Sequence, residues 1–263
     1  MRGRSNASCY MTIFALAAKD LWGCGVMYLA TWLCVTVALA ATTMALYVGA
    51  YRASPPALPL ASAVWAVAIA SFLRLTWRHI TGAITDDVRS GAIASRMRYP
   101  LPYLGFIAAD HMGRSLPIAA PFLCLAAYLA GGFPTLASPS VSLAYCGALI
   151  VASMTISMEL YMLMGLTAFW IEDASPVLRI VEKIIVVLGG SIVPIALLPA
   201  GARTIIEYIP FTATGFAAQV TSMDFVTRAP RLLGIAWGWV VVCGLVLFVV
   251  WRRASTRVEV NGG

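Results

Sequence analysis

The sequence predicts an all-α integral membrane protein with six transmembrane helices, an N-terminal interfacial helix and a re-entrant extracellular hairpin between the fifth and sixth spans. The first observation is composition: of 263 residues, 61% are hydrophobic and only 11% are charged, whereas soluble domains carry about 25% charged residues. The second is that apolar residues form long unbroken runs, which indicates helices rather than the alternating strands of a barrel. The third is that the charged residues gather at the ends of these runs.

The same composition excludes two kinds of site. The net charge of +7 would favour nucleic acid if the basic residues formed a stripe, but they are scattered at the ends of apolar runs. No nucleic-acid partner is therefore expected. The 6 cysteines lie in or beside apolar runs without a CxxC pair, so we expect buried thiols rather than disulfides or a metal site.

An amphipathic segment precedes the first span. Residues 8–21 would form a helix with one apolar face, made of Tyr10, Ile13, Phe14, Ala17 and Leu21. A helix of this kind fits the inner interface of a membrane. The alternative is that it forms the first turns of a long first span.

Six apolar runs are long enough to be considered as spans. They are Gly25–Val48, Leu58–Leu75, Ser115–Phe133, Val141–Trp170, Val177–Leu198 and Leu232–Val250. At about 1.5 Å per residue, the fourth exceeds a hydrocarbon core of about 30 Å, so it must tilt, kink or project. The start of the third is open, because residues 101–113 also have helical character. Before the fifth, Ser175 and Pro176 are expected as the N-cap and first helical residue.

The basic residues predict the orientation. With both termini in the cytoplasm, most of the 18 lysines and arginines fall on the inner side, as the positive-inside rule requires. The exceptions on the outer side are Arg52, Arg203, Arg228 and Arg231.

A polar loop, residues 77–103, follows the second span and is unusually charged for this chain. Asp86 and Asp87 are expected at the start of one short helix. Arg96 and Arg98 are expected at its end, so that the charges complement the helix dipole, and prolines then stop it. Such a helix is placed to contact something in the cytosol. The alternative is a solvated loop that only obeys the positive-inside rule.

Glu159 is the one carboxylate placed deep within a predicted span. An ionisable residue there costs roughly 2.5–3.5 kcal/mol, so a partner or a cavity is expected. If the third span begins near Tyr103, Arg114 lies at a similar depth and could pair with Glu159. If it begins at Ser115, Arg114 is interfacial and pairs with Asp110 one turn back. A structural role for Glu159 is favoured over substrate contact.

Residues 189–220 are too broken to cross the bilayer and too apolar to form a free loop. Broken apolar helices predict a hairpin that dips into the outer leaflet. Arg203 and Glu207 are four residues apart, so they share a helical face and are expected at its water-facing rim. Tyr208 is expected to anchor at the interface.

Nucleotide-binding and hydrolytic motifs are missing from the sequence. There is no GxxxxGK[ST], no HExxH and no GxSxG, and neither Lys19 nor Lys183 follows a glycine-rich loop. We expect no catalytic residue, no metal site and no cofactor in this chain.

Short motifs in the second half carry a family resemblance. They are AFWIED at Ala168–Asp173, LGGSIVP at Leu188–Pro194, LLP at Leu197–Pro199 and IPF at Ile209–Phe211. Together with the six spans, the amphipathic start and the broken hairpin, this succession resembles the type-2 ABC exporter permeases, in particular the viologen-exporter-like branch of the ABC-2 family. The resemblance covers nearly the whole chain.

The resemblance implies the membrane half of an exporter in a bacterial plasma membrane. Such a permease would pair with a second permease chain, homologous or identical, and dock on a separate cytosolic ATPase that binds ATP and Mg. It implies coupling residues after the second and fourth spans, namely Asp86, Asp87, Arg89, Gly91, Arg96, Arg98, Glu172 and Asp173. It also implies an extracellular gate that includes Gly189, Gly190, Pro194, Pro199, Arg203, Glu207, Pro210 and Phe211. The alternative for this hairpin is a rigid plug.

Two other classes of protein remain open on the sequence. A secondary transporter or channel would carry an inverted repeat and several intramembrane charges, but no repeat is evident. A non-transporting membrane scaffold is the second. Whether an ATPase subunit co-purifies with the chain distinguishes both from a permease.

Overall fold

The computed structural model describes residues 6–23, 59–75, 79–98, 101–114, 139–171 and 173–261, with scattered positions between 30 and 49. These residues form helices and turns, and none lies in a strand. The helices are α1 (Asn6–Gly23), α3 (Leu60–Leu75), α4 (His79–Arg89), α5 (Ala92–Arg96), a helix over 103–114, α7 (Pro139–Leu166), α8 (Ala168–Ile171), α9 (Ser175–Leu188), η1 (Ile195–Leu197), α10 (Ala200–Ile206), α11 (Pro210–Ala213), η2 (Phe216–Thr221) and α12 (Phe225–Asn261).

Parts of the prediction fall outside this description. They are most of the first predicted span, all of the third, and Glu172. The scattered positions described between 30 and 49 are helical.

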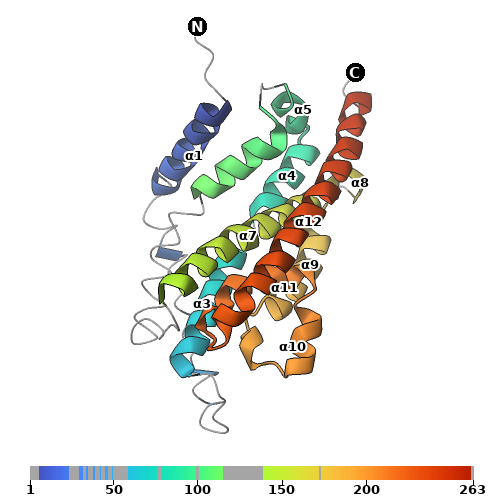
Figure 1. Cartoon of the computed structure of the whole chain (residues 1–263). Helices are drawn as coiled ribbons and strands as arrows, with labels where there is room; N and C mark the ends of the chain where they lie inside the picture. The colour runs from blue at the N-terminus through green and yellow to red at the C-terminus, as the bar shows by residue number, and fades with distance from the viewer. Residues whose placement is uncertain are drawn as a thin grey trace.

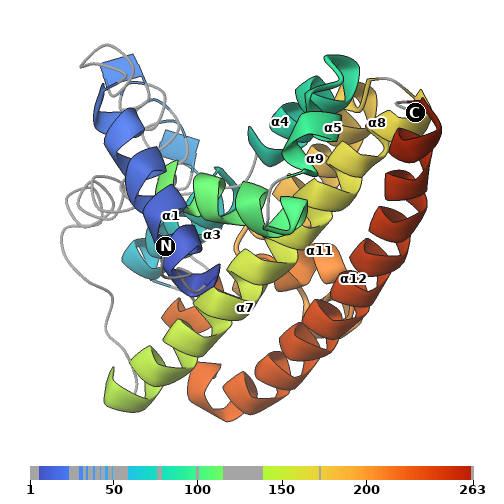
Figure 2. The ribbon, with the colours of Figure 1, turned by 90° about the horizontal axis from the view of Figure 1, so that it is seen from above.

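Two long helices, α7 and α12, run side by side and organise the fold (Figures 1 and 2). Residues Ser140–Ile171 and Phe225–Arg257 are long and apolar enough to cross a membrane. They contain the fourth and sixth predicted spans. The 37 residues of α12 extend for about 55 Å, so this helix projects beyond a hydrocarbon core of about 30 Å.

Buried side chains form one apolar cluster at each end of this helix pair. One cluster joins α4, α5 and the last turns of α7 to Leu247 of α12. Figures 1 and 2 show α4, α5, α8 and the C-terminus gathered there, and we call this the α8 end. The other cluster joins α3, η2 and the first halves of α7 and α12. We call it the α10 end, because α10 lies there (Figure 1).

The helix α4 is held closely against α7. The Thr81 hydroxyl donates to the backbone carbonyl of Tyr161 at 2.8 Å. A Cβ on Gly165 of α7 would lie 2.9 Å from the Ile84 side chain, so glycine permits this approach. The two aspartates that follow in α4 are therefore fixed relative to α7.

The polar loop forms two helices, so the prediction of one helix from Asp86 to Arg98 is wrong. The first, α4, ends at Arg89, and Gly91 then adopts φ 72° before α5 begins. A left-handed residue breaks a helix, and glycine adopts this conformation without steric cost. Asp86 and Asp87 consequently lie in the last turns of α4 rather than at a helix start.

The N-terminal segment forms α1, as predicted, and its apolar face contacts protein. Ala17 is buried, while Tyr10, Ile13 and Phe14 are half-buried. A Cβ on Gly105 would meet the Tyr10 ring, which places this face against the helix over 103–114. Its position at a membrane interface stays a prediction.

The fifth predicted span is wrong in extent and in its cap. The helix α9 has 14 residues, or about 21 Å, which is shorter than a hydrocarbon core. It stops at Gly189 and Gly190, the latter with φ 80°. Ser175 is the first helical residue rather than the N-cap, and its N–H donates to the Asp173 carboxylate at 2.9 Å.

The broken segment that follows packs into the protein. All six residues of η2 are buried, and they lie against α3, α7 and α12. The Ser153 hydroxyl of α7 donates to the Ala213 carbonyl at 2.9 Å, and the Trp239 indole of α12 donates to the Tyr208 carbonyl at 3.1 Å. Side chains of the two long helices thus bind carbonyls that the broken helices leave free.

We predict that Gly215→Ala destabilises the protein by about 1–3 kcal/mol, the usual cost of overpacking. A Cβ at Gly215 would collide with the backbone carbonyl of Gly189, and neither backbone segment can move freely. Thermal unfolding of the purified protein in detergent measures the loss.

Gly147→Ala is the matched control for this variant. Gly147 is exposed on α7, and a Cβ there meets nothing within 4 Å. Alanine is the better helix former, so this variant should be at least as stable as the native protein. Equal stability of the two variants would contradict the close contact between residues 189 and 215.

Candidate functional site

Asp87 organises the α8 end. Its side chain is buried. Its Oδ2 accepts a hydrogen bond from the Tyr103 hydroxyl at 2.8 Å and forms an ion pair with the Arg96 guanidinium at 2.8 Å. Burial and the hydrogen bond to Asp87 raise the pKa of Tyr103, so this hydroxyl stays a donor. One carboxylate therefore joins α4, α5 and the start of the helix over 103–114.

This arrangement divides the predicted coupling residues into two groups. Asp87 and Arg96 hold the loop together, and the Arg96 guanidinium also lies 5.6 Å from the centre of the Phe106 ring. The residues that remain exposed are Asp86, Arg89, Gly91 and Arg98. We call residues 86–98 the α4–α5 turn.

The structure brings the second predicted segment beside this turn, since α8 contacts α4. Hydrogen bonds from Ser175 lower the pKa of Asp173, with smaller contributions from the charges of Arg89 and Arg179. Asp173 is therefore ionised at neutral pH and within electrostatic range of Arg89. Two segments that lie far apart along the chain thus form one polar surface, which carries both positive and negative side chains.

The last turns of α12 attach to the same surface at two points. Trp251 stacks on Tyr103, with ring centroids 5.3 Å apart and planes 12° apart. The Arg257 guanidinium donates to the Phe169 carbonyl at 3.3 Å and lies 5.1 Å from the centre of the Trp170 ring. The α4–α5 turn, α8 and α12 are therefore joined through side chains.

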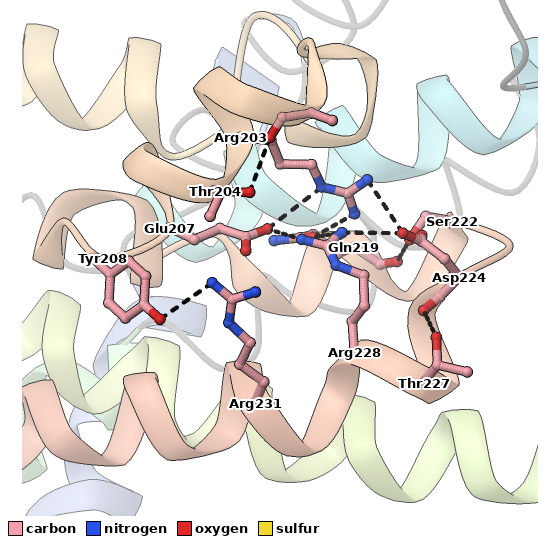
Figure 3. Close-up of polar contacts among 11 residues, drawn as sticks. Arg203, Thr204, Glu207, Tyr208, Gln219, Ser222, Asp224, Thr227, Arg228 and Arg231 are labelled. Atoms are coloured by element: carbon pink, nitrogen blue, oxygen red, sulfur yellow. Dashed lines mark hydrogen bonds and ion pairs between the residues drawn. The ribbon is translucent and has the colours of Figure 1, made fainter.

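An ion cluster forms at the opposite, α10 end (Figure 3). Glu207, which follows α10, is 0% exposed and pairs with Arg203 at 3.4 Å and with Arg228 of α12. Both arginines also bond Asp224 at 3.3 Å and donate to the Gln219 side-chain carbonyl at 3.1 and 3.3 Å. Three short elements, α10, η2 and the first turn of α12, meet at these groups.

The prediction that Arg203 and Glu207 share a helical face is confirmed by their ion pair. The prediction that they form a water-facing rim is wrong, because the Glu207 side chain is 0% exposed and that of Arg203 only 14%. Burial arises because Arg228, distant in sequence, turns from α12 onto Glu207. Tyr208 is exposed, and its hydroxyl accepts a hydrogen bond from Arg231 at 3.2 Å.

The other predicted gate residues bound the short helices of the segment. Pro194 and Pro199 precede η1 and α10, and Pro210 is the first residue of α11. The Phe211 carbonyl accepts the Thr214 hydroxyl at 2.6 Å. These positions explain where helices begin, but none of these four side chains belongs to the ion cluster.

Of the two partners considered for Arg114, Glu159 and Asp110, the structure shows Asp110. Arg114 pairs with Asp110 at 3.0 Å, one helical turn back. Glu159 is buried between α7 and α12, where its Oε1 would lie 3.1 Å from a Cβ on Gly244. Glycine at this point of α12 makes room for the carboxyl group, and Glu159 faces protein. Its Oε2 has no hydrogen-bond partner among the described residues, so the expected partner is not found there.

Sequence reasoning missed Tyr103 and Arg228. Tyr103 bonds Asp87 and stacks on Trp251, and both partners are too distant along the chain for a local pattern to identify them. Arg228 had one usable signal, since it lies four residues after Asp224 and could be expected to pair with it. Its more important partner, Glu207, is 21 residues away.

These observations define a helical membrane protein with a charged surface at one end and a buried ion cluster at the other. Residues 59–262 match the family model described as ABC-2 family transporter protein. The chain belongs to this family. It is therefore a membrane-embedded component of an ABC transporter, a permease rather than the ATPase. A search of curated proteins found no match.

We predict that Arg228→Ala destabilises the protein by about 3–5 kcal/mol, because removal of one partner leaves a buried charge under-compensated. Glu207 would retain only Arg203, and Gln219 would lose one of its donors. Thermal unfolding in detergent measures this effect.

Arg252→Ala is the control. Arg252 also lies on α12, but it is exposed and its guanidinium lies 5.7 Å from the centre of the ring of exposed Phe248. Exposed contacts contribute little, so its stability should stay near that of the native protein. Losses of similar size in the two variants would show that the buried cluster is not what stabilises this end.

Proposed function

We propose that this chain is the membrane-spanning permease of an ATP-driven exporter in a bacterial plasma membrane. It forms the translocation path with a second permease chain and is driven by a separate cytosolic ATPase that binds ATP and Mg. The family supports the transporter class. We propose in addition the two partner chains, the direction of export and the bacterial plasma membrane.

The observation that carries the proposal is the composite polar surface at the α8 end. The α4–α5 turn is held by the buried Asp87–Arg96 pair and by Tyr103, so its exposed residues are fixed in place. Arg89 of the turn lies near Asp173, which follows α8. A rigid surface that carries positive and negative charges can bind a soluble partner and transmit force from it. A flexible charged loop could not transmit force.

The distribution of basic residues supports a cytoplasmic position for this end. Its exposed cations include Arg89, Arg98, Arg179, Arg252, Arg253 and Arg257. At the α10 end Arg203 and Arg228 pair with Glu207 in the ion cluster, and Arg231 is exposed. By the positive-inside rule the α8 end is proposed to face the cytoplasm, and both termini are proposed to lie on that side of the membrane.

Six spans fit the described helices under this orientation. The second span is α3. The fourth is α7 with α8, and the sixth is α12. The fifth is α9 followed by a segment that returns toward the α10 end. The first and third spans would be supplied by residues 25–48 and 115–133, and residue 114 is then interfacial, in keeping with the Arg114–Asp110 pair.

The segment 189–220 is proposed as the extracellular gate. It lies at the α10 end, it is built of short helices, and ion pairs join the end of α10 to α12. Short helices joined at glycines and prolines can shift as units without unfolding. The second permease chain would close the path from the other side.

We predict that the double variant Arg89→Glu, Arg98→Glu weakens ATPase binding at least about tenfold, since like charges facing a partner cost affinity. Both residues are exposed on the α4–α5 turn. Co-purification of the ATPase with the tagged permease, and its ATP hydrolysis rate, measure the effect.

Lys19→Glu is the control, because Lys19 is an exposed cation on α1, away from α5 and α8 (Figure 2). It should leave ATPase recovery unchanged. Full recovery and full activity with the double variant would exclude the α4–α5 turn as the docking surface, and absence of any ATPase with the native chain would exclude the function itself.

A further inference from the structure

One continuous helix connects the two polar sites. α12 runs as one helix from Phe225 to Asn261, with Pro230 in its second turn. Its first turns carry Arg228, which pairs with buried Glu207, and its last turns carry Trp251, which stacks on Tyr103. These two attachment points are about 35 Å apart at about 1.5 Å per residue, so α12 is a path by which a displacement of one end can reach the other.

Tyr103 makes two specific contacts that point to different elements. Its ring stacks on Trp251 of α12, and its hydroxyl donates to Asp87 in the last turn of α4. The same carboxylate receives Arg96 of α5. Tyr103 therefore contacts α12 directly, and it is connected to both α4 and α5 through the Asp87 carboxylate.

Packing leaves this residue no freedom to absorb a movement. Tyr103 is 3% exposed and belongs to the apolar cluster that includes Ile84, Ile93 and Leu247. Interiors packed to this density transmit displacement rather than deform. The contact from Arg257 to α8 gives α12 a second attachment to the same surface.

We propose that Tyr103 is the positioning residue through which movement of the α4–α5 turn reaches α12, and that α12 carries it to the ion cluster of the gate. This inference rests on the proposed function, because a bound ATPase is what moves the turn. The stack on Trp251 provides the mechanical contact. The hydrogen bond to Asp87 keeps the ring in register with the turn.

The test measures ATP-dependent hydrogen exchange of residues 200–224 in the permease–ATPase complex reconstituted in nanodiscs. In the native complex, ATP should change the exchange of this segment. Tyr103→Phe keeps the ring and loses the hydroxyl, while Trp251→Leu loses the stack. Each variant is measured with enough ATPase to saturate binding. We expect the ATP-dependent change in the opening equilibrium to fall roughly fivefold, the effect of one lost hydrogen bond or a similar contact.

Two further variants separate transmission from simple loss of structure. Trp251→Phe retains a ring for Tyr103 to stack on, so it should keep the response that Trp251→Leu loses. Phe248→Leu removes an aromatic side chain from the exposed face of α12, where it is 57% exposed beside Arg252, and should leave the response intact.

The outcomes distinguish this inference from the proposed function. If Tyr103→Phe and Trp251→Leu bind the ATPase and keep the full ATP-dependent change, Tyr103 is not the link. The same conclusion follows if Trp251→Phe loses the ATP-dependent change as fully as Trp251→Leu does. If the native chain binds no ATPase, the proposed function has failed first, and the inference fails with it.

Discussion

The broken segment between α9 and α12 leaves backbone carbonyls that no helix satisfies, and the fold depends on how α7 and α12 meet them. In an apolar environment each unsatisfied group costs several kcal/mol. Ser153 of α7 and Trp239 of α12 supply donors to this segment. The buried Glu207 then requires cations, which come from α10 itself and from α12. The two long helices are therefore both scaffold and hydrogen-bond partner, and the ion cluster ties the short helices to α12.

The sequence predicted well those features that depend on local pattern. Long apolar runs identified α7 and α12, the amphipathic face identified α1, and glycine and proline positions identified where residues 189–220 break. The i,i+4 spacing correctly paired Arg203 with Glu207, and it gave Asp110 as one of two possible partners of Arg114, the one that the structure shows. In each case the physical cause acts within one or two helical turns.

Features that depend on distant partners could not be predicted in this way. Asp86 and Asp87 suggested a helix start by their charge, but Tyr103 and Arg96 bury Asp87 at a helix end, and Gly91 breaks the loop in two. Glu207 suggested a water-facing rim, but Arg228 lies against it and buries it. The length of α9 was overestimated because apolar composition continues beyond Gly190, where a left-handed turn ends the helix. Tertiary contacts decided the burial of Asp87 and Glu207, which a single sequence does not encode locally. The breaks at Gly91 and Gly190 are local, but a glycine in a sequence does not by itself show that its φ is positive.

Site-specific photo-crosslinking in cells tests most directly the central claim that the α8 end receives an ABC ATPase. A photoreactive amino acid would be placed at Ser90 in the α4–α5 turn, at Ser175 after α8, and at Met223 at the α10 end, all of which are exposed. We predict adducts with an ABC ATPase from positions 90 and 175 and none from position 223. Adducts with the ATPase from position 223, or none from positions 90 and 175, would contradict the claim.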